Sequence, residues 1–488
     1  MQNNELAAQE LSAANPQKHS KQKLERGLSN RNIQLIALGG AIGTGLFMGS
    51  GKSIHLAGPS ILLVYAIIGI VIFLIMRAMG EVLLHNLSYK SFQDFAGHLL
   101  GPFAGFLTGW SYWVLWVLIA IGDMVVVTGY FDFWIQNTTI SAICTVALLI
   151  ALLISNLLTV KLFGEIEFWF ALIKIVAILA LILVGGAMVA TGFAGSNGVA
   201  ASFTYLWSHG GFFPTGATGF LAAFPIAIYS FIGTELIGTT AAETQDPQTT
   251  IPRAINAVPM RIVFFYVLSL AIIMSITPWD QIDPQQSPFV NVFNLAGLVA
   301  AASVMNFVVL TSASSSANSG IYSSSRMLYA LGLTRLASRK FGRLGKHRVP
   351  SRALALSGGL IFLFVPLLWL GGSVMDAFAL VMDAASTLIL GIWALIVLAY
   401  LKYRKVYPQA HAASPYKMPG SSWTPYLCLA FIIFIGALLT IDPNTRAAFL
   451  LTPIWFMILG VAWMFRKNAD TELAAASSKA DPHRIDEA

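Results

Sequence analysis

The sequence predicts an all-α membrane protein that crosses the bilayer about twelve times. The first observation is composition: 57% of the 488 residues are hydrophobic and only 10% are charged, whereas soluble domains contain about 25% charged residues. The second is that apolar runs of about 20 residues, the length of a spanning helix, recur along the chain. The third is that lysine and arginine gather in alternate connections between these runs. A bilayer can cover this much apolar surface, whereas a soluble core cannot.

The apolar runs divide the chain into spans and tails. They cover 33–56, 59–84, 103–134, 139–160, 168–191, 218–242, 258–279, 298–330, 353–371, 375–401, 424–441 and 448–465. We expect a flexible cytoplasmic tail at 1–30, a core of ten spans at 31–403, two further spans within 404–467 and a second cytoplasmic tail at 468–488. No cleavable signal pattern follows the polar start of the chain, so the first run is predicted to stay in the membrane.

The basic residues predict an orientation. We place the N-terminus in the cytoplasm and count lysine and arginine on each side. The inside then holds Lys18, Lys21, Lys23, Arg26, Arg31, Arg335, Arg339, Lys340, Arg343, Lys346, Arg348, Arg352, Lys402, Arg404, Lys405, Lys417, Arg466 and Lys467, and the outside holds Lys52 and Arg446. This bias predicts an even number of spans with both termini in the cytoplasm. It also makes topology a better explanation of the net charge of +7 than a nucleic-acid partner.

A short sequence occurs twice, once in each half of the chain. The first span contains Ile42-Gly43-Thr44-Gly45-Leu46 and the sixth contains Ile232-Gly233-Thr234-Glu235-Leu236, which agree at four of five positions. The two copies are offset by five spans, an odd number, so the helices that carry them run in opposite directions. This predicts a five-plus-five inverted repeat, over about 31–191 and 216–403, with broken helices 1 and 6. A chance match between two apolar segments is the alternative.

The glycines of these segments predict a binding site. Glycine is a poor helix former, and broken backbone at membrane depth is tolerated only where it is buried or lines a cavity. Unwound helices offer N–H groups to a carboxylate and C=O groups to an ammonium. Two such breaks at the midplane would therefore suit an amino acid, which carries both charges. Close helix packing is the alternative explanation of the glycines.

Ionisable residues inside the spans are candidates for function. Lys174 lies seven residues past Glu167, about 10 Å into the membrane, and we expect its charge to change during transport unless it snorkels back to the interface. Glu235 lies inside the sixth-span break, where it could sense a substrate amine, pair with Lys174 or carry a proton. Asp123 in the third span is a candidate to face the cavity.

Three further polar positions have weaker claims. Glu243, near the cytoplasmic end of the sixth span, could latch a gate or be an ordinary interfacial charge. Ser315 belongs to a hydroxyl-rich stretch of the eighth span that could bind a cation or an ammonium, or only bond between helices. Asp383 in the tenth span has no predicted role. Cys144 and Cys428 lie in apolar runs and indicate neither a disulfide framework nor a metal site, and no cofactor is expected.

Longer motifs make the chain recognisable. They include Gly39-Gly40-Ala41 leading into Ile42 to Phe47, Arg77-Ala78-Met79-Gly80-Glu81, Thr239-Thr240-Ala241-Ala242-Glu243-Thr244 and Ser316-Ala317-Asn318-Ser319-Gly320. From about Leu28 to Phe465 the chain resembles the amino acid–polyamine–organocation superfamily, in its amino-acid permease family, and most closely the bacterial D-serine/D-alanine/glycine permeases. Asp376, Met382 and Asp383 are not residues expected of that branch.

The resemblance implies what the chain does and where. It implies a twelve-helix fold and proton-coupled import of small neutral amino acids across the cell membrane. It implies that the substrate carboxylate meets Gly43, Thr44 and Gly45, while the amine meets carbonyls near Ile42, Ser230 and Phe231. Lys174 matches a fifth-span lysine that stands where sodium-coupled relatives hold sodium.

The combined hypothesis is a proton-coupled importer of glycine, D-alanine and D-serine, with L-alanine left open. The expected partners are the amino acid, protons and the lipid bilayer, and the chain is expected to be a monomer or weak homo-oligomer. No loop can hold an ATPase module, so a gradient would drive transport. An amino-acid sensor built like a transporter, or a permease for another amino acid, is the alternative. The sequence contains no pore motif that would indicate a channel and no paired catalytic groups that would indicate an enzyme.

Overall fold

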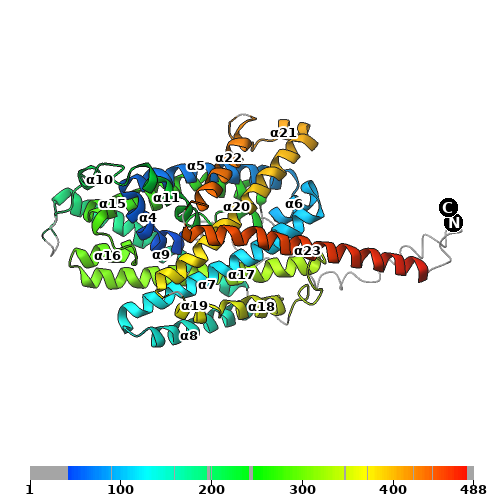
Figure 1. Ribbon diagram of the computed structural model, residues 1–488, viewed down its shortest axis with the longest axis horizontal. Helices are drawn as coiled ribbons and strands as arrows, with labels where there is room; N and C mark the ends of the chain where they lie inside the picture. Colours follow the sequence, from blue (N-terminus) through cyan, green and yellow to red (C-terminus); the bar gives the residue numbers. More distant parts are fainter. Residues whose placement is uncertain are drawn as a thin grey trace.

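The computed structural model describes residues 42–89, 91–158, 160–194, 198, 200–240, 246–345, 348–370, 372–420, 422–441 and 443–480. Helices make up the ordered architecture of these residues, and most of them run along the long axis of the molecule (Figure 1). All-helical structure follows from the membrane setting, because each helix satisfies its own backbone polar groups where water is absent.

The elements follow one another without a separate folded domain. In the first half they are η1 (Gly45–Gly49), α4 (Ser50–Ala57), η2 (Gly58–Ser60), α5 (Ile61–His85), α6 (Phe92–Leu100), α7 (Pro102–Ile135), α8 (Thr138–Leu158) and α9 (Val160–Thr191). The middle part contains α10 (Tyr205–Ser208), α11 (Gly216–Tyr229), α12 (Leu236–Thr240), α13 (Pro247–Asn256), α14 (Val258–Arg261), η4 (Ile262–Leu268), α15 (Ser269–Ile276), η5 (Trp279–Gln281) and α16 (Pro288–Leu295). The last part contains α17 (Val299–Leu333), α18 (Ser351–Ile361), α19 (Phe364–Leu370), α20 (Val374–Val406), α21 (Pro408–Ala413), α22 (Thr424–Leu439) and α23 (Pro443–Ala480).

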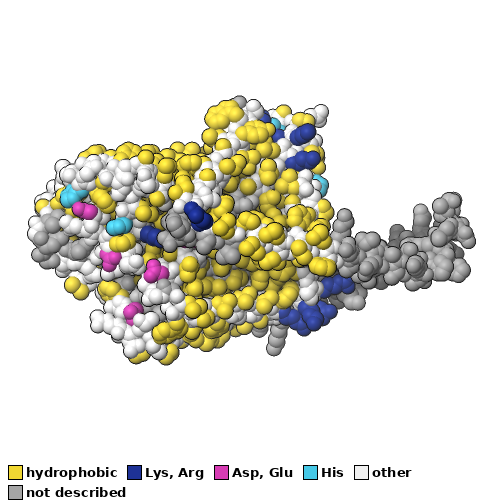
Figure 2. Space-filling view, viewed as in Figure 1, with side chains coloured by type: hydrophobic (Ala, Val, Ile, Leu, Met, Phe, Trp, Pro, Cys, Tyr) yellow, Lys and Arg dark blue, Asp and Glu magenta, His cyan; other side chains and the backbone are white. Residues whose placement is uncertain are grey.

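The surface confirms a polytopic membrane protein. Within the described residues, nine helical stretches are long and apolar enough to span a bilayer, and α11 and α22 are shorter apolar helices. Large apolar side chains such as Leu183 (74% exposed) and Ile433 (71% exposed) point outward. Figure 2 shows apolar side chains over most of the visible surface. A surface of this kind is stable against lipid and would aggregate in water.

Two long helices, α7 and α17, form the centre of the bundle. They pack along each other, and α7 also packs against α20, α6 and α8. Close approach is possible because Gly320 of α17 faces α7: a Cβ there would lie 3.1 Å from the Trp116 carbonyl oxygen and 3.0 Å from the Ala120 Cβ. Small residues at helix contacts are the usual basis of packing in membranes.

The structure differs from the predicted spans in informative places. The fifth span was predicted to begin at 168, with Glu167 at its edge, but α9 already begins at Val160 and Glu167 is buried, at 1% exposure. The charge of Glu167 misplaced the boundary, because a hydropathy pattern treats any carboxylate as interfacial. At the other end, α23 continues to Ala480, through part of the range predicted as a tail.

Candidate functional site

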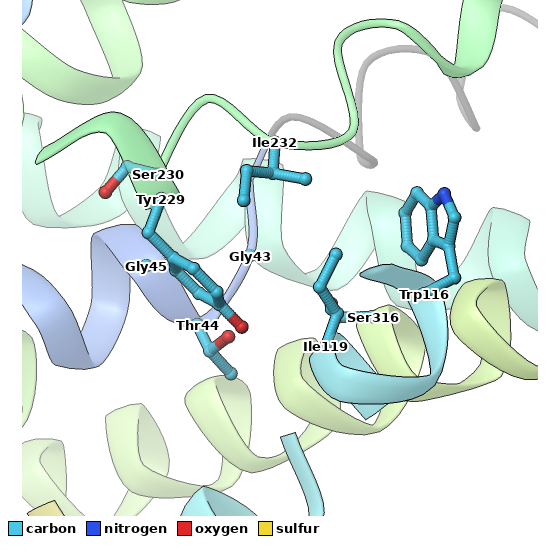
Figure 3. Close-up of a pocket in the computed structure, with 9 residues that line it drawn as sticks. All are labelled: Gly43, Thr44, Gly45, Trp116, Ile119, Tyr229, Ser230, Ile232 and Ser316. Carbon is cyan, nitrogen blue, oxygen red and sulfur yellow. The ribbon is translucent and has the colours of Figure 1, made fainter. Parts of the chain in front are cut away.

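A small cavity lies between the first and sixth predicted spans. The sixth span is interrupted: α11 ends at Tyr229 and α12 begins at Leu236. Ile42 and Gly43 likewise precede the first helical turns without regular helical structure, while residues before Ile42 lie outside the described chain. The cavity is lined by Gly43, Thr44, Gly45, Tyr229, Ser230 and Ile232 from the two segments, Trp116 and Ile119 from α7, and Ser316 from α17 (Figure 3).

The first-span segment touches the interruption of the sixth span at Gly45. A Cβ on Gly45 would lie 2.7 Å from the Ser230 Cα and 2.8 Å from the Ser230 nitrogen, closer than real side chains approach backbone. At Gly43 the nearest atom would be the Ser316 Oγ at 3.8 Å, an ordinary contact. Gly45 therefore allows the segments to pack, whereas Gly43 leaves open space that belongs to the cavity.

Aromatic and hydroxyl groups bound the cavity. The Tyr229 ring points toward Thr44, and the Ser230 side chain points away from it (Figure 3). The Ser230 Oγ is instead paired with the Tyr65 hydroxyl at 3.1 Å, and the Tyr266 hydroxyl donates to the Ser230 carbonyl at 2.8 Å. Trp116, Ile119 and Ile232 enclose the remaining side, so the room for a ligand side chain is limited by bulky apolar groups.

Glu235 stabilises the break of the sixth span. Its carboxylate accepts a hydrogen bond from the Gly233 N–H at 3.0 Å and from the Tyr112 hydroxyl at 3.3 Å, and it is fully buried. Gly233 has φ of +102°, a conformation that residues with a Cβ adopt only with strain. The glycine makes the turn and the carboxylate satisfies an N–H group that the interrupted helix leaves without an intrahelical acceptor.

Lys174 lies deep in the bundle, where α9, α17 and the first span meet. Its Nζ donates to the Ile42 carbonyl at 3.2 Å and to the Ser315 Oγ at 3.1 Å. Ser312 donates to the same Ile42 carbonyl at 3.2 Å. Ser315 in turn donates to the Glu167 Oε1 at 2.6 Å. The lysine therefore connects the Ile42 backbone of the first span to Ser315 of α17.

Asp123 connects this cluster to the cavity. The Thr44 hydroxyl donates to the Asp123 Oδ1 at 2.7 Å, and Asp123 is fully buried. Thr44 lines the cavity, and Asp123 also acts electrostatically on Lys174. A change of charge at Lys174 can thus act on the cavity through the Asp123 carboxylate and the Thr44 hydroxyl.

The structure separates the predicted site residues into three groups. Gly43, Thr44, Gly45 and Ser230 line the cavity. Ile42, Lys174, Ser315 and Asp123 form the cluster behind it. Gly233 and Glu235 interact within the sixth-span break. A pair of Glu235 with Lys174 stays a prediction.

Three other predicted positions have different outcomes. Phe231 stacks on Tyr266, with ring centroids 5.1 Å apart, and supports the break from behind. Asp383, for which no role was predicted, is buried in α20. Glu243 lies outside the described residues.

Several residues of the site were not identified from the sequence. The hydropathy pattern predicts Glu167 at the edge of a span, although its spacing of seven residues from Lys174 places both side chains on one helix face. Tyr112, Trp116, Ile119 and Tyr229 looked like ordinary apolar positions in spans. No pattern along the chain distinguishes an aromatic residue that faces a cavity from one that faces a neighbouring helix.

Comparison with known proteins shows which family the chain belongs to. The family model for amino acid permeases matches residues 32–472. The chain is 52% identical to the "D-serine/D-alanine/glycine transporter" of Escherichia coli K12 over 457 residues, which cover 93% of this chain and 96% of that protein. The protein of the same description from Escherichia coli O6:H1 is 53% identical over the same shares. The "Aromatic amino acid transport protein AroP" of Escherichia coli K12 is 40% identical over 93% of this chain and 97% of that protein. With a family match over nearly its whole length and relatives above half identity, the chain belongs to the amino acid permease family.

Proposed function

We propose that this protein is a secondary active transporter that imports small neutral amino acids, namely glycine, D-alanine and D-serine, together with a proton. Its family and similar relatives are permeases and not enzymes. The observation that carries the proposal is the cavity between the two interrupted segments, which combines backbone and hydroxyl groups with bulky apolar walls. Such a site binds the charged ends of an amino acid and leaves little room for its side chain.

The proposed architecture goes with this function. We place twelve helices in the membrane, with a five-plus-five inverted repeat, broken helices 1 and 6, and both termini in the cytoplasm. Supporting features are the sixth-span interruption and the basic side chains, which gather toward the end of the visible surface that carries α21 (Figure 2). Transport then proceeds by alternating access around the cavity, as a monomer or weak homo-oligomer in the cell membrane.

Uptake into proteoliposomes tests the function. Labelled glycine, D-alanine, L-alanine and D-serine are compared with and without an inward proton gradient. If one proton enters with each substrate, a gradient of one pH unit sustains up to about tenfold accumulation. Saturable glycine uptake that is equal with and without the gradient would contradict proton coupling but not transport. Non-saturable flux would contradict a carrier.

Replacement of Lys174 by methionine tests the proposed proton site. We expect Lys174→Met protein to bind substrate yet fail to accumulate it, because the side chain keeps its length but can no longer exchange a proton. Lys52→Met, which removes a lysine from α4 outside the cavity lining, is the matched control. Full pH-driven accumulation by Lys174→Met would remove this lysine from the coupling mechanism.

A further inference from the structure

Glu167 and Lys174 form a buried pair of titratable residues on α9. They lie seven residues apart, so both side chains leave the same face of the helix. Each is only 1% exposed. Ionisable groups at membrane depth are costly, and those that persist pair with one another or take part in transport.

Ser315 of α17 joins the two groups. Its Oγ accepts from the Lys174 Nζ at 3.1 Å and donates to the Glu167 Oε1 at 2.6 Å. A hydroxyl in this position can pass a proton in one concerted step. As an N–H bond of the ammonium breaks, an O–H bond forms at the Ser315 Oγ; the former hydroxyl proton moves to the Glu167 Oε1. The lysine becomes a neutral amine, the carboxylate becomes a carboxylic acid, and both hydrogen bonds remain with their directions reversed.

The charges of the cluster favour an added proton. Lys174 is acted on by two carboxylates, Glu167 on its own helix and Asp123 on α7. Around these charges, α17 presents the neutral side chains of Ser315, Asn318 and Ser319, and the first span presents the Ile42 carbonyl. Two carboxylates against one ammonium leave an unbalanced negative charge, and burial of such a charge is expensive. One additional proton makes the cluster neutral.

Glu167 is the carboxylate of the cluster that the Ser315 hydroxyl connects to Lys174. The Glu167 Oε2 and the Asp123 Oδ2 are both buried and, within the described residues, have no hydrogen-bond partner. A buried oxygen without a donor destabilises the ionised form of a carboxylate. Asp123, by contrast, interacts with the cavity through Thr44 and is the group placed to respond to substrate.

We infer that Glu167 stores the transported proton and that Ser315 relays it from Lys174. The inference rests on the proposed proton coupling. After the relay, the neutral lysine accepts a proton from the cavity side, where Asp123 and Thr44 connect the cluster to the substrate. The loaded cluster then holds an ammonium, a carboxylate and a carboxylic acid. Release to the other side runs the same steps backward.

Two assays separate proton transfer from substrate handling. The first is glycine accumulation in proteoliposomes under an inward proton gradient, with proton entry followed by an internal pH-sensitive dye. The second is exchange of external labelled glycine for internal glycine at equal pH, which needs no net proton movement. Glu167→Gln keeps the shape of the side chain and the oxygen that accepts the Ser315 hydrogen bond. We expect this variant to retain exchange. We expect its ratio of internal to external glycine to fall to about 1, since no gradient energy is then coupled to uptake.

The serine variants keep the inference testable if Glu167→Gln does not fold. Ser315→Ala removes the relay and should lower proton entry with each glycine, whereas Ser315→Thr keeps a hydroxyl and should restore it. Ser314→Ala is the matched control, because the Ser314 hydroxyl donates to the Leu310 carbonyl of its own helix. Accumulation at the wild-type ratio by Glu167→Gln or Ser315→Ala would overturn the inference while leaving proton coupling intact. Equal glycine accumulation by the wild-type protein with and without the proton gradient would instead contradict the proposed coupling itself.

Discussion

At the scale of single residues, the two glycines of the first-span motif have different tasks. Gly45 lies against the backbone of Ser230, with no room for a Cβ, whereas Gly43 faces the cavity. The same substitution should therefore have two distinct consequences. Both glycines belong to one short motif, so sequence alone assigns them a common role.

We predict that Gly45→Ala destabilises the protein, by about 1–3 kcal/mol or more, because the added methyl overlaps backbone that cannot move aside. Gly43→Ala should fold normally, since its Cβ makes only an ordinary contact with Ser316. Its methyl group occupies cavity space, so glycine affinity should fall by roughly tenfold, or about 1.4 kcal/mol. Thermal unfolding in detergent and equilibrium binding of labelled glycine measure the two effects. Equal thermal stability of both variants would contradict the assigned roles.

At the scale of elements, the interruption between α11 and α12 depends on few residues. Gly233 supplies the positive φ, and Glu235 caps its N–H group. The stacked rings of Phe231 and Tyr266 support the segment from behind. The break is therefore a built structure with satisfied polar groups, and not a region of irregular chain.

We predict that Glu235→Gln lowers the rate of glycine transport, because a neutral amide holds the Gly233 N–H less strongly than a carboxylate does. Tyr112→Phe should have a smaller effect, because the hydrogen bond it removes is long, at 3.3 Å. Initial rates of uptake at saturating glycine measure both. Unchanged transport by Glu235→Gln at every external pH would contradict the argument that this carboxylate holds the break in a transport-competent form.

A second element-scale feature is the attachment of the segment that follows α20. The buried Glu81 of α5 accepts from the Tyr400 hydroxyl at 2.9 Å and the Met418 N–H at 3.0 Å, and it contacts the His411 Nδ1 at 2.6 Å. Nearby, Arg77 donates to the Asn256 Oδ1 at 2.9 Å. The second-span motif that contains Arg77 and Glu81 thus connects α21 and the following loop to α5, and connects α5 to α13.

We predict that Glu81→Gln loosens this attachment, because hydrogen bonds to a charged group are each worth about 1.5–3 kcal/mol. Amide hydrogen exchange over 408–418 should accelerate. Asp283→Asn, in an exposed loop where the carboxylate bonds to its own loop at Gln285, should leave that exchange unchanged. Protection equal to the wild type in Glu81→Gln would contradict the anchoring role.

At the scale of the whole molecule, charge and apolar surface predict how the protein sits in the membrane. Most basic side chains visible in Figure 2 lie toward one end of the molecule, and a broad apolar surface lies between the ends. From the positive-inside bias we therefore predict that the end that carries α21 faces the cytoplasm.

Single-cysteine labelling tests this orientation in a chain without Cys144 and Cys428. We predict that Arg446→Cys reacts with a membrane-impermeant maleimide in intact cells, because Arg446 is exposed at the predicted outer face. Arg343→Cys, exposed in the basic loop, should react only after permeabilisation. The opposite pattern would reverse the orientation, and equal labelling of both would contradict a single topology.

Much of this protein was determined by the sequence alone. Composition and apolar runs settle the membrane class, because no soluble fold can bury so much apolar surface. The sixth-span copy of the glycine-rich motif marks the observed interruption between α11 and α12, because backbone preference is local. Even Lys174 and Glu235 stand out, since any charge in an apolar run is conspicuous.

Only the tertiary structure decided which of these residues act together. Glu167, Lys174 and Ser315 meet because α9 and α17 pack side by side, and Asp123 reaches Thr44 because α7 passes behind the first span. Such contacts depend on the rotation and depth of each helix in the bundle. Small residues at helix contacts and the shape of the cavity together determine both. Hydropathy records how apolar a position is and not what it faces, so it assigned Glu167 to the edge of a span when it belongs to the buried cluster.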